Sequence, residues 1–145
     1  MVPRLFRSQE RDIRGTFVAQ LQNLVQQVRA QAREIELVHK VVFDILKHEV
    51  FVERAEKKGF LKNIATEKFV RQDQQIFLPE ALVVKSLFVD GQSEVDSRTT
   101  QSWFFVDQDG NVQAVTLRLG SDADETESIY ELNPFSGQFE QKEDV

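Results

Sequence analysis

Residues 9–36 carry the feature that most limits how this 145-residue chain can fold, an apolar stripe that repeats with the period of an α-helix. Its members are spaced by three or four residues and are widened by Val18 and Val25: Ile13, Phe17, Leu21, Leu24, Val28, Ala32 and Ile35. Ser8 is a suitable N-cap, so we predict a helix over residues 8–36. A helix of about 26 residues is near 40 Å long at roughly 1.5 Å per residue. That length exceeds the width of a domain of this size, so part of the helix should project beyond its own core or need a partner.

The rest of the chain, residues 40–141, has the composition and spacing of short β-strands. Seven segments rich in β-branched and aromatic residues are separated by short connections: 40–46, 49–54, 81–89, 102–106, 112–119, 128–132 and 138–141. Residues 55–80 are less decided and fit a short helix or an irregular loop. Because strands joined by short turns are antiparallel, the sequence predicts an α+β domain over residues 1–145. A long N-terminal α-helix would pack on antiparallel sheet of about seven short strands.

Composition argues against an enzyme and against a membrane helix within these residues. The chain has no Cys and only two His, so thiolate and multi-histidine metal centres are excluded. His39 and His48 would approach each other only if their strands pair suitably, and solvated or core-edge histidines are the favoured interpretation. No phosphate loop or nucleophile motif is present, and no apolar run approaches the roughly 18 residues of a membrane span. We therefore predict no catalytic residue, no cofactor and no metal site.

Two further groups of residues are candidates, one for a calcium site and one for a partner-binding surface. Asp107, Asp109 and Asn111 surround Gly110, and an acidic loop follows at residues 120–127, which raises the question of calcium. If segments 102–106 and 112–119 form a hairpin, the two loops lie at its opposite ends, so turn chemistry is the favoured interpretation. Trp103, Phe104 and Phe105 should be split between two faces of a strand. Core packing is favoured for them, although an open face would expose aromatic side chains suited to a partner.

The net charge of −6 hides an asymmetry between the two halves of the chain. Residues 1–72 carry a net charge of +5, and residues 73–145 carry −11. The acidic excess argues against nucleic acid as a partner. Solvated surface charge is the favoured interpretation, and head-to-tail packing of copies or relatives is the alternative.

Five segments, taken in order, carry a resemblance to a known family. They are VPRLF, with Pro3 at a kink position; FVAQLQNLVQQVRAQAREIELVHKVVFDI; IFLPEALVVKSLF; WFFVDQDGNVQAVTLRL; and SIYELNPFSGQFEQ, with Ser136-Gly137 where Thr-Gly is usual. The series resembles the pilin family, and within it the H-type minor pseudopilin of the bacterial type II secretion system. The resemblance spans nearly the whole chain, although each segment alone is short and degenerate.

The resemblance implies a structural subunit of a short filament that helps export folded proteins across the outer membrane. The family's cleavage-site Gly, the following Phe and Glu, and its apolar segment are not in this sequence. We therefore expect a soluble periplasmic domain whose anchor in the inner membrane is a preceding helix. The implied partners are other major and minor pseudopilins and, as a further candidate, the secreted cargo. The helix residues expected to contact neighbouring subunits are Phe6, Arg11, Ile13, Arg14, Phe17 and Leu21.

Two other functions remain open at the level of sequence. A minor pilin of the FimT/FimU type from a type IV pilus would have the same fold in a different machine. A soluble α+β ligand-binding domain would instead show a deep pocket with convergent polar groups.

Overall fold

The computed structural model describes residues 4–58, 67–90, 92–93, 100–121 and 127–142, with backbone alone at 4–12 and 92–93. It contains one long helix, α1 (Arg4–Ile35), followed by strands. The strands of the described residues are β1 (His39–Asp44), β2 (Glu49–Ala55), β3 (Phe69–Phe77), β4 (Val83–Val89), β5 (Gln92–Ser93), β6 (Gln101–Val106), β7 (Val115–Gly120), β8 (Ser128–Leu132) and β9 (Phe139–Gln141). The predicted α+β class is confirmed, with more strands than expected.

Helix α1 starts earlier than the sequence analysis predicted. It begins at Arg4, so Ser8 lies inside the helix and does not cap it. The added turn contains Arg4, Leu5 and Arg7, and these residue types favour helix even where no apolar stripe marks it. At Glu36 the backbone turns into the left-handed region (φ 57°), which ends the helix and directs the chain into β1. The helix has 32 residues and is therefore about 48 Å long.

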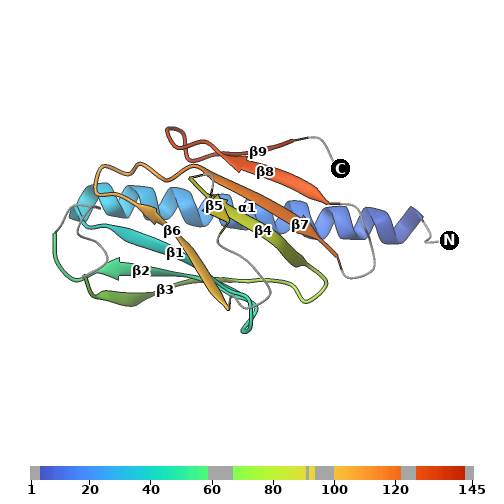
Figure 1. The fold of residues 1–145 in the computed structure, drawn as a ribbon, viewed down its shortest axis with the longest axis horizontal. Coiled ribbons are helices and arrows are strands. Elements are labelled where there is room, and N and C mark those ends of the chain that lie inside the picture. The colour runs from blue at the N-terminus through green and yellow to red at the C-terminus, as the bar shows by residue number, and fades with distance from the viewer. Residues whose placement is uncertain (1–3, 59–66, 91, 94–99, 122–126, 143–145) are drawn as a thin grey trace.

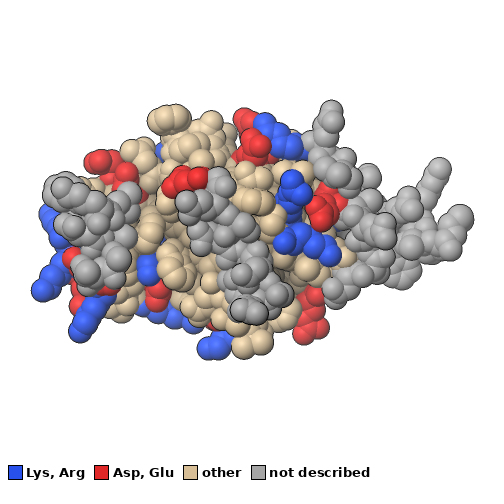
Figure 2. Space-filling model, viewed as in Figure 1, with Lys and Arg blue, Asp and Glu red and all other residues tan. Residues whose placement is uncertain are grey.

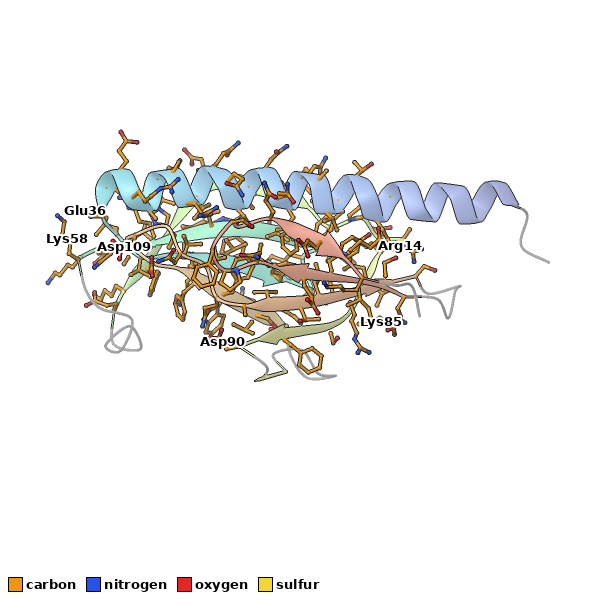
Figure 3. The ribbon with its side chains drawn as sticks, turned by 90° about the horizontal axis from the view of Figure 1, so that it is seen from above. Arg14, Glu36, Lys58, Lys85, Asp90 and Asp109 are labelled. Atoms are coloured by element: carbon orange, nitrogen blue, oxygen red, sulfur yellow. The ribbon has the colours of Figure 1, made fainter. Side chains whose placement is uncertain are left out.

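The strands form two antiparallel sheets. The first sheet has the order β3-β2-β1-β6 and the second sheet the order β5-β4-β7-β8-β9. Helix α1 runs along one side of both sheets, and its N-terminal turns continue past the ends of the strands (Figures 1 and 3). No helix in the part of the chain that the structure describes is long and apolar enough to cross a membrane.

Two expectations about the strands are wrong. Residues 69–77, left open as helix or loop, form strand β3 at the edge of the first sheet. Segments 102–106 and 112–119 do not form an extended hairpin, because β6 pairs with β1 whereas β7 lies between β4 and β8. They meet only at the antiparallel bridge between Val106 and Val112, next to the turn. The connection at residues 107–114 is long enough to carry the chain from one sheet to the other. The predicted Asp-Gly turn is present within it, with Gly110 at φ 83° and Asp107 Oδ1 accepting the backbone N–H groups of Asp109 and Asn111.

One hydrophobic core joins the helix to both sheets. Its largest fully buried apolar side chains are Phe17, Leu21, Val25, Val28, Val41, Phe43, Leu87, Phe104, Leu117 and Leu119. Burial of each large apolar side chain contributes roughly 1.5–3 kcal/mol to the free energy of folding. The helix therefore stabilises the sheets as well as being stabilised by them.

Candidate partner-binding surface

The exposed face of α1 carries no charge over four turns. Between residues 15 and 30 its exposed positions are Gly15, Thr16, Ala19, Gln20, Asn23, Gln27 and Ala30. These side chains are small or end in neutral amide or hydroxyl groups. In a chain with 29% charged residues, such a face is unusual for a surface that serves solvation alone.

A groove lies between this face and the edge strand β3. Its volume is about 740 Å³. The polar lining residues are Thr16, Gln20, Asn23, Gln27, Gln74 and Gln75, and the apolar ones are Ile13, Phe17, Leu24, Ile76, Phe77 and Pro79. None of these side chains ionises near neutral pH, so the groove offers hydrogen bonds and apolar contact without charge.

Two large apolar side chains stand in solvent at one end of the first sheet. Phe77, at the end of β3, is 74% exposed, and Leu46, in the turn between β1 and β2, is 75% exposed. Phe77 pairs with Glu49, the first residue after that turn, so both side chains belong to the same end of the sheet. Exposed apolar groups of this size beside a groove mark a candidate contact surface.

The structure changes the assignment of the predicted helix residues. Phe17 and Leu21 are buried against the domain's own sheets, so the expectation that they face a neighbouring subunit is wrong for their side chains. The sheets cover the apolar stripe from Phe17 to Ala32, which the helical period alone could not reveal. Ile13 is half-buried and lines the groove. The side chains of Phe6 and Arg11 lie outside the described residues.

Arg14 is buried rather than free on the surface. The residue is only 4% exposed, and among the described residues its Nε and Nη1 atoms have no hydrogen-bond partner. Figure 3 shows it near the point where α1 passes beyond the strands. A buried guanidinium with unpaired donors reduces stability unless another group satisfies it.

Arg29 joins α1 to the two loops that cross its C-terminal half. Its Nε donates to Gly110 O at 2.7 Å, its Nη2 to Phe135 O at 2.8 Å, and its Nη1 to Ser136 O. Gln26 adds a bond to Gly137 O at 2.8 Å. Burial, with Arg33 nearby, lowers the pKa of Arg29 without removing its charge. These hydrogen bonds hold the turn of the predicted terminal hairpin against the C-terminal half of α1.

The aromatic residues of β6 are split between two faces, as predicted. Phe104 is in the core, whereas Trp103 is 42% exposed on the opposite face. Lys40 lies over this outer cluster, with Nζ 4.1 Å from the ring centre of Phe69 and 4.6 Å from that of Trp103. Burial lowers the pKa of Lys40. The outward aromatic rings therefore already have a cation–π partner, Lys40, within the chain itself.

The described residues do not assemble a catalytic or metal-binding group. His39 lies at the start of β1, and His48 lies in the turn after its end, so the hairpin separates them. No three or more acidic or histidine side chains gather as metal ligands among the residues that can be placed. The acidic segment 122–126 lies outside the described residues.

Charge is intermixed on the face of the molecule shown in Figure 2, where acidic and basic side chains lie beside one another and uncharged ones fill much of the middle. Among the described residues, ion pairs join Arg71 to Glu49 at 3.1 Å and Lys58 to Glu36 at 2.9 Å.

Comparison with known proteins identifies the fold. No protein-family model and no curated protein matches the chain. Among solved structures, it is similar to the minor pseudopilin EpsH from the Type 2 Secretion System of Vibrio cholerae. The two are 14% identical, the match covers 88% of this chain and 94% of that chain, and the TM-score is 0.54. At this identity the likeness concerns the fold, and it confirms the predicted pilin-like architecture.

Proposed function

We propose that this chain is a non-enzymatic structural subunit of a type II secretion pseudopilus. The observation that carries the proposal is the uncharged exposed face of α1, on a helix that continues beyond the head of the protein. The fold shared with a minor pseudopilin supports it. In this proposal the head lies in the periplasm, and a preceding segment anchors it in the inner membrane.

The helix face is suited to packing against another helix. Gly15, Ala19 and Ala30 are small and exposed, so a second helix can approach the backbone of α1 closely. The amides of Gln20 and Asn23 can bond to a partner without the desolvation cost of a charged group. We expect major and minor pseudopilins to provide the opposing helices.

Arg11 and Arg14 are included in the proposed contact for different reasons. We propose that Arg11, in the projecting part of α1, pairs with an acidic residue of a neighbour and fixes its register. Arg14 has two donors without a partner among the residues that the structure describes, and an acidic side chain of a neighbour would accept hydrogen bonds from them. Phe6 and Ile13 would add apolar contact.

Because the chain contains no cysteine, single-cysteine variants test the contact directly. Asn23→Cys places a thiol on the uncharged face, and Lys58→Cys places one beyond the C-terminal end of α1, beside Glu36. In the bacterium that encodes the protein, a thiol cross-linker should join Asn23→Cys to a sibling subunit and leave Lys58→Cys unlinked. Equal yields at the two positions would contradict the assignment of this face.

Gene deletion separates the proposal from its alternatives. Loss of secretion of folded proteins, restored by the native gene, is the expected result. Loss of surface pili with secretion intact would assign the chain to a type IV pilus instead. If the deletion changes neither secretion nor pili, the remaining alternative is a soluble ligand-binding domain, and the groove with its polar lining would be the candidate pocket.

A further inference from the structure

The free edge of β3 presents backbone hydrogen-bonding groups beside the groove. The backbone N–H of Leu78 donates to His48 O at 2.8 Å, and β3 continues in register with β2 through Ile76↔Val50. In an antiparallel ladder, alternate residues direct their N–H and C=O groups toward the partner strand. The backbone N–H and C=O groups of Ile76 and Leu78 therefore point toward β2, and those of Gln75 and Phe77 point away from it, toward the open edge. In the part of the chain that the structure describes, no strand pairs with this edge.

The groove beside the edge has the dimensions of an extended peptide. Its helix wall runs from Ile13 to Gln27, which is about 21 Å at roughly 1.5 Å per residue. An extended chain advances about 3.3 Å per residue, so roughly six residues would fill that length. Side chains on one side of such a segment would face the amides of Gln20 and Asn23, and the backbone would reach Gln75 and Phe77.

The charge of the lining selects among possible segments. Among the described side chains, no acidic or basic one lines the groove, although both signs are frequent elsewhere on the chain. A charged side chain entering it would lose hydration without gaining an opposite charge. An uncharged segment with alternating apolar and polar residues can contact the apolar and the amide side chains of the lining without losing the hydration of a charge.

We propose that an extended, uncharged segment of a partner protein adds to β3 as a further strand of the first sheet and fills the groove along α1. Pairing through the backbone supplies the affinity, and the neutral lining supplies the selectivity. The segment would lie against Gln20 and Asn23, which the proposed function assigns to a neighbouring helix, so the two contacts share these side chains. The inference itself rests on the free edge of β3 and is tested on the purified protein with a peptide, so its failure can be distinguished from failure of the proposed function.

Two capped peptides test the proposal on the isotopically labelled protein. The first is Thr-Val-Thr-Val-Thr-Val, and the second replaces each Thr by Lys. We expect the neutral peptide to shift the amide resonances of Gln75 and Phe77 and to slow their hydrogen exchange at least tenfold, with the lysine peptide at least tenfold weaker. Absence of both effects at millimolar neutral peptide would overturn the proposal, whatever any variant shows.

Variants separate strand addition from other modes of binding. Gln75→Pro removes an outward N–H without removing a bond to β2 and should abolish binding. Asn23→Lys brings a charge into the groove and should weaken the neutral peptide at least fivefold, whereas Ala30→Lys, exposed on α1 outside the lining, should not. Unchanged binding by a folded Gln75→Pro would exclude backbone pairing. If Gln75→Pro does not fold, the amide hydrogen exchange of Phe77 in the native protein, with and without the neutral peptide, decides whether the backbone of β3 pairs with it. A concentration-dependent dimer that competes with the peptide would assign the edge to a second copy of the chain and overturn the proposal of a foreign segment.

Discussion

Arg29 holds two loops, at Gly110 and at residues 135–136, against helix α1. It donates to three backbone carbonyls that belong to two loops far apart in the sequence. A Cβ at Gly137 would lie 2.5 Å from Arg29 Nη1, and Gly137 has a positive φ of 66°. The terminal turn and the guanidinium are therefore fitted to each other, and Gly137 is required for both reasons.

Replacement of Arg29 by Met should destabilise the protein without altering the helix. The three carbonyls lose a charged donor, and we expect the free energy of unfolding to fall by about 3 kcal/mol. Urea denaturation measures this change. Arg33→Met, one turn further along and exposed, is the matched control and should change stability by no more than about 0.5 kcal/mol. Similar losses in the two variants would remove the special role of Arg29.

His39 should make stability depend on pH. Burial of its ring lowers the pKa of His39, and the nearby charge of Arg54 acts in the same direction. The hydrogen bond between Nδ1 and Leu37 O, at 2.8 Å, opposes this shift without reversing it. The unfolded chain then binds a proton that the folded chain rejects, so stability is complete above a pH of about 6.5 and decreases as pH falls below it.

The melting temperature between about pH 7.5 and 5.5 tests this effect. His39→Asn can keep a donor near the Nδ1 position and should flatten the decrease on acidification. His48→Asn, at an exposed turn position with positive φ, is the control and should keep the native pH dependence. A native slope that persists in His39→Asn would place the titrating group elsewhere.

Arg14 gives the opposite prediction for stability. Because its Nε and Nη1 are buried and unpaired, Arg14→Met should raise the free energy of unfolding by about 1–2 kcal/mol in the isolated domain. The same variant should weaken association with sibling subunits if a neighbour's carboxylate satisfies these donors. Lower stability with unchanged association would show that Arg14 serves the fold alone.

At the scale of the elements, α1 has two parts with different roles. Its buried positions from Phe17 to Ala32 belong to the core, whereas its first turns pass beyond the sheets (Figure 1). A chain starting at Ile13 should therefore unfold with a free energy within about 0.5 kcal/mol of the native value and lose association at least tenfold. A chain starting at Val18 also loses Phe17 and should be less stable by about 3 kcal/mol or more, because a large core side chain is removed. Equal stability of the two shortened chains would contradict this division.

The elements also show what the sequence could and could not predict. The helix was predictable because its apolar period is long and regular, and most strands were predictable because they are β-branched and bounded by turns. Strand β3 was missed because polar residues fill its centre, from Arg71 to Gln75, and as an edge strand it buries little. The separation of β6 from β7 could not be predicted, because the connection between them permits either a hairpin or a crossing.

The candidate surface was only partly predictable for a related reason. The sequence marks which helix positions are apolar, but only the fold shows that Phe17 and Leu21 are covered by the chain's own sheets. The groove depends on α1 meeting β3, whose existence was not predicted. The glutamine-rich flank of the helix was visible in the sequence, and its lack of charge was the signal that could have identified the exposed face.

At the scale of the whole molecule, the surface combines an uncharged helix face with a head whose charges are mixed. Association through such a helix face should depend little on ionic strength, because few exposed charges are brought together. This expectation distinguishes packing of the uncharged face from steering by Arg11, which salt would screen.

The measurement is the binding of the purified domain to the major pseudopilin of the same bacterium. Between about 0.05 and 0.5 M salt, the dissociation constant should change by no more than about threefold. Arg11→Glu should then weaken binding modestly, and its effect should shrink as salt rises. A dissociation constant that rises tenfold or more with salt in the native protein, and does not in Arg11→Glu, would contradict this expectation. It would show that Arg11, and not the uncharged face, makes the main contact, because only a charge-dominated interface is weakened by screening to that extent.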